Sequence, residues 1–211
     1  MRAVRLALTK GRIEKAALGL MARAGYDTEP LVRKGRKLIV PIDGGKLEVV
    51  FAKAADVITY VETGACDIGI VGKDTINEMG GSYYEMADLR SGRCRMVLAA
   101  PVGSDFYGGY RAKRIASKYP KAAAEFFAGK QMDVKVLKIE GSVELAPALG
   151  MADGIVDIVE TGTTLKENGL EVVETVFEIS TRMIVNIASL KLRKAEIEEI
   201  VARMNAAIGG E

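Results

Sequence analysis

Residues 144–170 read ELAPALGMADGIVDIVETGTTLKENGL and carry the clearest pattern in the chain. Their centre, residues 155–159, is a short apolar run rich in β-branched side chains, which is typical of a buried strand. Residues 161–164, TGTT, then interrupt the run, and residues 165–168 predict a short helix that ends at Gly169. The segment therefore predicts a strand that passes through a hydroxyl-rich loop into the start of a helix.

The predicted loop suits a phosphate monoester. Backbone N–H groups at a helix N-terminus, threonine hydroxyls and the positive end of the helix dipole all favour an anion. The acidic side chains of Asp153, Asp157 and Glu160 could accept hydrogen bonds from the hydroxyls of a sugar attached to that phosphate. The alternative is an ordinary threonine-capped turn, and the TGTT tetrapeptide alone favours that alternative. The whole segment is more specific than the tetrapeptide.

Composition limits the classes of protein to which the chain can belong. Its 211 residues are enough for one large or two small domains, and its net charge of +2 does not indicate a nucleic-acid-binding protein. The first residues, MRAVRLALTKGR, place arginines where a signal peptide would be apolar, and no apolar run reaches membrane-spanning length. Cys66 and Cys94 lack metal-type spacing, so we expect buried, reduced thiols in a cytoplasmic protein. We expect neither nucleic acid nor a membrane among its partners.

The sequence contains no histidine and no tryptophan. Nucleophile systems that need histidine, histidine general bases and histidine metal sites are therefore excluded. Any chemistry has to use carboxylates, lysine, arginine, hydroxyls, the backbone or a metal carried by a ligand. This composition fits a transfer reaction in which positioning and charge neutralisation supply most of the catalysis.

Strands and helices are predicted to alternate along the chain, which is typical of an α/β protein. Apolar runs predict strands at residues 4–8, 47–51, 67–71, 95–100, 134–139 and 155–159, with a long β-rich stretch at 171–187. Helical periodicity predicts helices at residues 12–24, 54–62, 121–128, 143–149 and 194–207. The apolar stripe of the last helix is interpreted as core packing rather than as a partner surface; it consists of Ile197, Ile200, Val201 and Met204.

Two segments, residues 63–72 and 149–159, resemble each other weakly. Each passes from a predicted helix through a glycine turn and an aspartate into a buried strand. Either two such units are alike by chance, or the chain has two similar lobes that present loops to a shared cleft. The residues alone leave both interpretations open.

Several blocks of the chain resemble the ATP phosphoribosyltransferase family of histidine biosynthesis. The phosphoribosyl-binding signature of that family is matched by Glu144, Gly150, Asp153, Asp157, Thr161, Gly162, Thr164 and Leu165. Four further blocks follow the family order, at residues 8–12, 67–74, 92–95 and 141–144. The blocks span nearly the whole chain. The chain as a whole resembles the short-form catalytic subunit of the family.

The resemblance implies an α/β fold of two lobes, like the type II periplasmic binding proteins, with mixed sheets and a cleft between the lobes. It implies a discontinuous first domain, residues 1–93 and 181–211. It also implies a second domain, residues 94–180, that carries the phosphoribosyl-binding loop. Two strands, near residues 92–99 and 180–185, are expected to cross between the domains.

The resemblance also implies which residues bind phosphoribosyl pyrophosphate. The residues expected to hold the 5-phosphate are Thr161, Gly162, Thr163 and Thr164. The residues expected to hold the ribose hydroxyls are Glu144 and Asp157. Three tyrosines, Tyr107, Tyr110 and Tyr119, could line an adenine pocket or simply pack in a surface loop, and the sequence does not decide between these.

Cationic blocks elsewhere in the chain are implied to act on phosphates. The contacts to the nucleotide and to pyrophosphate are expected from Lys10, Gly11 and Arg12. The catalytic residues, which neutralise the pyrophosphate leaving group, are expected to be Arg12, Arg36 and Lys53. A slip of one residue would give the role of Arg36 to Lys37. Lys53 stands where the family usually has arginine, which keeps the charge but loses the bidentate fork.

The implied reaction is attack of adenine N1 of ATP on the anomeric carbon of phosphoribosyl pyrophosphate, with release of pyrophosphate. Adenine N1 has a free lone pair, so no general base is needed. Mg²⁺ is expected on the substrate phosphates rather than in a dedicated protein site.

The implied assembly is a homodimer of catalytic chains joined to a regulatory subunit related to histidyl-tRNA synthetase. Long members of the family carry a histidine-sensing domain after the helix at residues 194–207, where this chain runs out. Two other functions would suit the fold. A non-catalytic solute-binding protein would need a signal peptide, and the effector domain of a regulator would need a DNA-binding segment. We expect neither.

Overall fold

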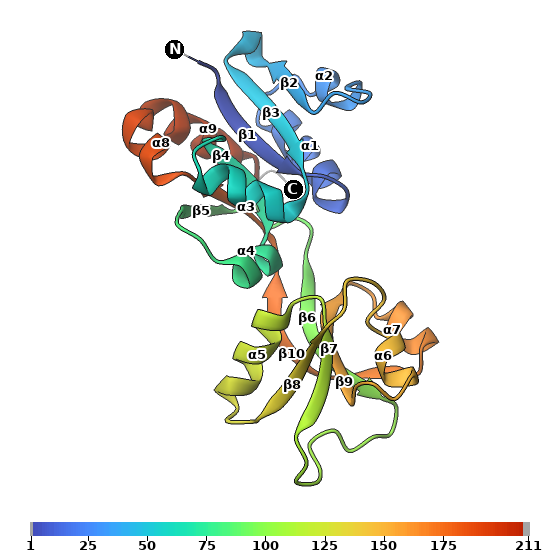
Figure 1. The fold of residues 1–211 in the computed structure, drawn as a ribbon. Helices are drawn as coiled ribbons and strands as arrows, with labels where there is room; N and C mark the ends of the chain where they lie inside the picture. Colours follow the sequence, from blue (N-terminus) through green and yellow to red (C-terminus); the bar gives the residue numbers. More distant parts are fainter. Residues whose placement is uncertain (1, 209–211) are drawn as a thin grey trace. The chain divides into compact units, whose positions relative to one another are not determined.

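The computed structural model describes residues 2–208, which form two compact units (Figure 1). Unit 1 combines the residues up to Gly92 with those from Ser180 onward, and unit 2 is the continuous stretch Arg93–Ile179. The chain therefore leaves unit 1 once and returns to it once. None of the helices in residues 2–208 is long and apolar enough to cross a membrane.

Unit 1 is built on a six-stranded sheet with the order β2-β3-β1-β4-β11-β5. Its strands are β1 (Val4–Thr9), β2 (Ile39–Ile42), β3 (Leu47–Ala52), β4 (Ile68–Gly72), β5 (Tyr84–Asp88) and β11 (Thr181–Val185). Strand β1 runs parallel to β3 and β4, whereas β11 is antiparallel to β4. Because the three parallel strands end at one edge of the sheet, the residues that follow them gather there.

Helices cover both faces of the sheet in unit 1. They are α1 (Arg12–Arg23), α2 (Glu29–Val32), α3 (Ala54–Glu62), α4 (Lys73–Met79), α8 (Ile187–Leu192) and α9 (Lys194–Ile208), with a short 3₁₀ turn at Asp43–Gly45. Helices α1 and α9 share one apolar core with the sheet, and α3 packs in a second core. The whole apolar stripe of α9 is buried in the first core. The interpretation of that stripe as core packing is confirmed.

Unit 2 contains a five-stranded sheet with the order β10-β6-β9-β7-β8. Its strands are β6 (Cys94–Pro101), β7 (Lys113–Ser117), β8 (Val134–Lys138), β9 (Gly154–Val159) and β10 (Leu170–Ile179). Helix α5 (Pro120–Gly129) packs in one core, while α6 (Leu145–Ala148) and α7 (Thr163–Glu167) pack in another. Strand β9 is parallel to β7 and antiparallel to β6. It therefore places the end of the 155–159 run at the edge where β7 also ends.

A buried carboxylate fastens the start of the chain to unit 1. The side chain of Asp67 is 0% exposed and accepts two hydrogen bonds from the Arg2 guanidinium, at 2.8 and 2.9 Å. It also accepts from the Arg5 amide at 2.8 Å and from the Ser189 hydroxyl at 2.7 Å. Arg193 lies 3.5 Å away. One carboxylate thus joins β1, the start of β4 and the α8–α9 region.

The two cysteines are both free and buried, as expected. Burial raises the pKa of the Cys66 thiol to about 11. A thiol with so high a pKa stays protonated at neutral pH and is unreactive.

Candidate functional site

The loop between β9 and α7 has the geometry of an anion-binding turn. Gly162 precedes α7 as its N-cap with φ 82°, a left-handed conformation that favours glycine. The hydroxyls of Thr161 and Thr163 lie 3.1 Å apart, and the Thr163 amide donates to the Thr161 hydroxyl at 3.4 Å. Leu165 is buried and anchors the short helix. The loop therefore presents hydroxyls and a helix N-terminus from a fixed base.

Two carboxylates lie near this loop at the same edge of unit 2. Asp157 lies in β9, and Glu144 is the N-cap residue of α6. Burial raises the pKa of Asp157 to about 6, and the charge of Glu144 adds to the rise. Lys118, directly after β7, partly offsets this rise. The charges of Glu144 and Asp157 thus influence each other at this edge of unit 2.

Asp153 does not belong to this group, and the expectation that it could accept a sugar hydroxyl is wrong. It precedes β9, so the six residues of that strand separate it from the threonine loop by about 20 Å. Its carboxylate pairs with Arg111 at 2.5 Å and with Arg114 at 3.3 Å. Burial alone would raise the pKa of Asp153, but the hydrogen bonds from Arg111 and Arg114 lower it to about 2. Asp153 therefore fastens the amino end of β9.

A second group of candidate residues lies in unit 1, at the edge where β1 and β3 end. Thr9 pairs with Ala52, so Lys10 and Lys53 follow adjacent parallel strands. The Lys10 amide donates to the Ala52 carbonyl at 2.9 Å, which holds the two turns together. Within residues 2–208, neither lysine side chain has an ion-pair or hydrogen-bond partner. Both ammonium groups are available to an anion.

Arg12 is held at the same edge by a side-chain hydrogen bond to the backbone. It is the first residue of α1, after Gly11, which has φ 89° and is the N-cap of the helix. The Arg12 guanidinium donates from Nη1 to the carbonyl oxygen of Gly92 at 2.7 Å. The side chain is therefore held against a backbone segment of unit 1 that is distant in the sequence.

The basic loop at residues 33–37 is attached to this edge through Lys34. The Lys34 ammonium pairs with Glu14 of α1 and lies 4.2 Å from the centre of the Phe51 ring on β3. Arg33 pairs with Glu29 on the surface. The side chains of Arg36 and Lys37 have no such partner within the described part of the chain. The contacts of Lys34 could not be predicted from sequence, because they depend on two residues that are distant in the chain.

Other expectations concern surface residues of unit 2. Glu140 is exposed and pairs with Lys138 at 2.8 Å, so it faces outward. The Tyr107 hydroxyl donates to Glu174 at 2.7 Å, and its ring packs edge-on against Phe106. Tyr107 therefore packs within the loop of its own unit.

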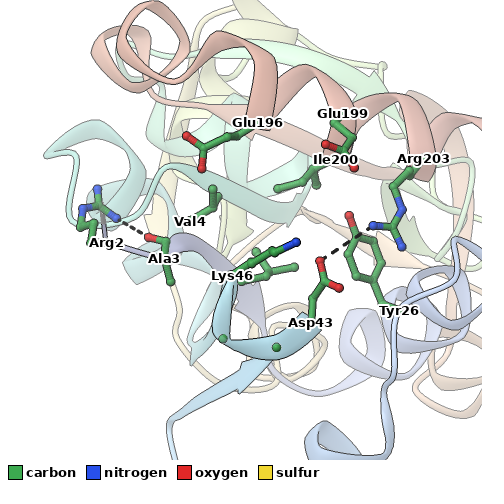
Figure 2. A pocket seen from close by; sticks show the side chains of 13 residues that line it. Arg2, Ala3, Val4, Tyr26, Asp43, Lys46, Glu196, Glu199, Ile200 and Arg203 are labelled. Atoms are coloured by element: carbon green, nitrogen blue, oxygen red, sulfur yellow. Dashed lines mark hydrogen bonds and ion pairs between the residues drawn. The ribbon is translucent and has the colours of Figure 1, made fainter.

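A pocket of about 310 Å³ lies at the opposite edge of unit 1, where β1 begins (Figure 2). Charged side chains of both signs line it, including Lys46 and Glu199. Figure 2 shows Arg203 beside Asp43 and Tyr26, and Arg203 lies 3.9 Å from the centre of the Tyr26 ring. Because the length of β1 separates this pocket from Lys10, the pocket is not part of the edge that carries Lys10 and Lys53. Residues 2–208 contain no group of three or more acidic or cysteine side chains placed to hold a metal ion.

Comparison with known proteins gives matches over nearly the full chain. The family model for ATP phosphoribosyltransferase matches residues 53–206. The ATP phosphoribosyltransferase of Clostridium kluyveri is 52% identical over 207 residues, which cover 98% of this chain and 94% of that protein. The ATP phosphoribosyl transferase (HisG:HisZ) complex from Thermotoga maritima contains a chain that is 33% identical with a TM-score of 0.81, and the match covers 97% of each chain.

A more distant likeness concerns the fold alone. The periplasmic aliphatic sulphonate binding protein SsuA from Escherichia coli gives a TM-score of 0.63 at 11% identity, over 99% of this chain and 73% of its own. The expected α/β fold of the periplasmic-binding-protein type is therefore confirmed.

Proposed function

The chain belongs to the ATP phosphoribosyltransferase family, and from this premise we propose which residues of each unit carry out the reaction. The protein transfers the phosphoribosyl group of phosphoribosyl pyrophosphate to N1 of the adenine of ATP, the first step of histidine biosynthesis. The alternative of a non-catalytic solute-binding protein is not favoured, because the likeness to the sulphonate binding protein SsuA is at 11% identity while the ATP phosphoribosyltransferase of Clostridium kluyveri is 52% identical.

Unit 2 binds the phosphoribosyl group in this proposal. The 5-phosphate is held by the loop that consists of Thr161, Gly162, Thr163 and Thr164. The observation that supports this assignment is the left-handed Gly162 at the start of α7, which opens backbone N–H groups next to two hydroxyls. Glu144 and Asp157 accept hydrogen bonds from the ribose hydroxyls. Binding at these remote groups positions the anomeric carbon for attack.

Unit 1 neutralises the charge of the phosphates. The barrier lies in departure of pyrophosphate and in positive charge on the ribose, so cations aimed at the leaving group stabilise the transition state. Lys10, Arg12 and Lys53 gather at one edge of the sheet, and the loop that carries Arg36 is attached to that edge. We assign catalysis to Arg12, Arg36 and Lys53, and nucleotide and pyrophosphate contacts to Lys10, Gly11 and Arg12.

We also propose that Mg²⁺ arrives on the substrate phosphates, where it would neutralise charge on the leaving pyrophosphate. Phosphate oxygens and water supply the hard ligands that this ion prefers. The protein residues named above then act on the outer phosphate oxygens.

The reaction itself is tested by mixing the purified protein with ATP, phosphoribosyl pyrophosphate and Mg²⁺. Formation of phosphoribosyl-ATP, followed by its absorbance, is the expected result. No product, even with a regulatory subunit added, would contradict the function.

Replacing Lys53 by alanine is expected to lower kcat about 10²-fold while weakening substrate binding much less, because a leaving-group cation acts mainly in the transition state. Lys53→Arg should keep or improve activity, since it restores the bidentate fork. The matched control is Lys46→Ala, which removes an exposed lysine before β3 rather than after it. Full turnover of Lys53→Ala with weaker binding would show that Lys53 only docks the substrate.

We further propose that the chain works in a hetero-oligomer with a regulatory subunit related to histidyl-tRNA synthetase, around a homodimer of catalytic chains. The Thermotoga maritima structure is a two-component complex, and its matching chain agrees with this one over 97% of its length. The buried stripe of α9 is not available for such a contact, so another surface has to serve.

The expected result is that histidine inhibits turnover only when the regulatory subunit is present. Turnover of the purified chain, with and without histidine and with and without that subunit, measures this. Clear inhibition of the chain alone, at a site distinct from the substrates, would refute the division into catalytic and regulatory subunits.

A further inference from the structure

Arg12 would be poorly restrained without a tertiary contact. It is exposed and begins a helix immediately after a glycine, where an arginine side chain can adopt many rotamers. Its Nη1 nevertheless donates to a backbone carbonyl 80 residues away, at 2.7 Å. A charge-assisted hydrogen bond of this length favours one orientation of the guanidinium.

The accepting residue, Gly92, is itself held in place. Next to it, the carbonyl of Ser91 accepts from the Thr181 amide at 2.9 Å, and the Leu89 amide donates to the Thr181 carbonyl at 2.9 Å. Thr181 in turn pairs with Gly72 at the end of β4. These hydrogen bonds hold the Gly92 carbonyl, which accepts from Arg12, at the same sheet edge that carries Lys10 and Lys53.

The absence of a side chain at Gly92 also matters. A β-carbon at this position would lie 3.4 Å from Arg12 Nη1 and 3.0 Å from the Thr181 hydroxyl oxygen. The distance to Thr181 is tighter than nearly all real contacts, and the distance to Arg12 Nη1 is at the limit of an ordinary contact, so the Thr181 side chain has to shift beside the guanidinium. The residue also has φ 58°, which disfavours other residue types. Two properties of glycine are thus used at one place, namely the left-handed backbone and the open space beside the Thr181 hydroxyl and the guanidinium.

We propose that Gly92 is a positioning residue for Arg12: its carbonyl orients the guanidinium, and its left-handed backbone and lack of a side chain let that carbonyl lie beside Thr181 without crowding. This inference rests on the proposed catalytic function of Arg12. Gly92 touches no substrate in this scheme, and its whole effect on turnover passes through Arg12.

The experiment compares Gly92→Ala and Gly92→Asn with matched variants at Gly44. Gly44 has φ 63° and would meet nothing within 4 Å if it gained a β-carbon, so it reports the backbone effect alone. Asparagine tolerates the left-handed region better than alanine, yet its side chain still crowds Thr181 beside Arg12. Both Gly92 variants are expected to lower kcat/KM about 10- to 100-fold, since misplacing a catalytic group by about 1 Å costs about 10²-fold. Both Gly44 variants should keep wild-type turnover.

A double-mutant cycle with Arg12→Ala separates positioning from general damage. Adding Gly92→Ala to Arg12→Ala is expected to cost no further turnover, because no guanidinium remains to be misplaced. Equal losses in both backgrounds would overturn the proposal, as would wild-type turnover of Gly92→Asn. Thermal unfolding of each variant confirms that it is folded at the assay temperature.

The outcomes also distinguish this inference from the function on which it rests. A slow Arg12→Ala variant beside fully active Gly92 variants overturns the role of Gly92 alone. Full turnover of Arg12→Ala overturns the catalytic assignment of Arg12 and the role of Gly92 with it.

Discussion

Gly162→Val is expected to abolish measurable binding of phosphoribosyl pyrophosphate, with a loss of turnover greater than about 10²-fold. At φ 82° a β-branched residue is strained, so the backbone should move out of the conformation that presents its N–H groups. Space is not the obstacle, because a β-carbon would meet only Val159 Cγ1, at 3.8 Å. The geometry of the loop itself is what the substitution removes. Calorimetric titration with phosphoribosyl pyrophosphate measures the effect.

The matched control for this prediction is Gly169→Val at the other end of α7. Gly169 has φ 69° and an open environment, so the substitution introduces a similar backbone strain away from the anion site. Binding should persist in this variant. Unchanged affinity in Gly162→Val, or an equal loss in both variants, would remove the loop from the substrate site.

The largest expected effect on stability comes from Asp67→Ala, about 3–5 kcal/mol of unfolding free energy. The substitution leaves Arg2 without its bidentate partner and removes the acceptor for the Arg5 amide and the Ser189 hydroxyl. Urea unfolding of the wild type and the variant measures the difference. The control is Glu29→Ala, which breaks the exposed pair with Arg33 and should cost about 0.5 kcal/mol or less. A similar cost in both variants would contradict the role of the buried carboxylate.

The same carboxylate predicts a dependence of stability on pH. Burial would raise the pKa of Asp67, but the hydrogen bonds from the Arg5 amide, Ser189 and Arg2 outweigh it, so the pKa is lowered. A carboxyl group with a lowered pKa in the folded state stabilises fully above its unfolded pKa of about 3.9. This contribution is lost as the pH falls through the lower, folded pKa. The difference in stability between wild type and Asp67→Ala should therefore shrink below about pH 4.

The sequence predicted best those elements whose apolar residues form a clear local pattern, either helical periodicity or a short continuous run. Helix α3 was expected at residues 54–62 and spans Ala54–Glu62, and the run at 155–159 became β9. Strand β7 was missed because its residues, KRIAS, include two cations. One of them, Lys113, is buried and donates to the carbonyl of Gly108 at 2.6 Å. A polar strand of this kind is stabilised by contacts that no local pattern records.

The edge strands of unit 1 were missed for a related reason. Strand β2 contains Pro41, and β5 alternates only weakly between apolar and polar residues. Such strands form because a neighbour offers hydrogen bonds, so their sequences are weakly constrained. The predicted helix at residues 143–149 shortened to Leu145–Ala148.

A candidate site can be proposed from sequence where a motif is continuous in the chain, as at Thr161, and not where the contact is made across the fold. The misplacement of Asp153 illustrates this. Asp153 stands only eight positions before Thr161 in the sequence. Strand β9 lies between them and is extended, so the two residues are at opposite ends of that strand. Lys34 and Gly92 show the converse, because each meets its partner only in the folded chain.

The discontinuity of unit 1 has a consequence for the order in which the protein matures on the ribosome. Strand β11 lies between β4 and β5 in the sheet, yet it is synthesised after all of unit 2. Until it emerges, β4 has an unpaired edge, and α9 is missing from the core that it shares with α1. Unit 2 is continuous and can fold as soon as Ile179 has left the exit tunnel. Unit 1, whose synthesis begins first, is therefore completed last. The nascent chain carries an unpaired sheet edge throughout the synthesis of unit 2.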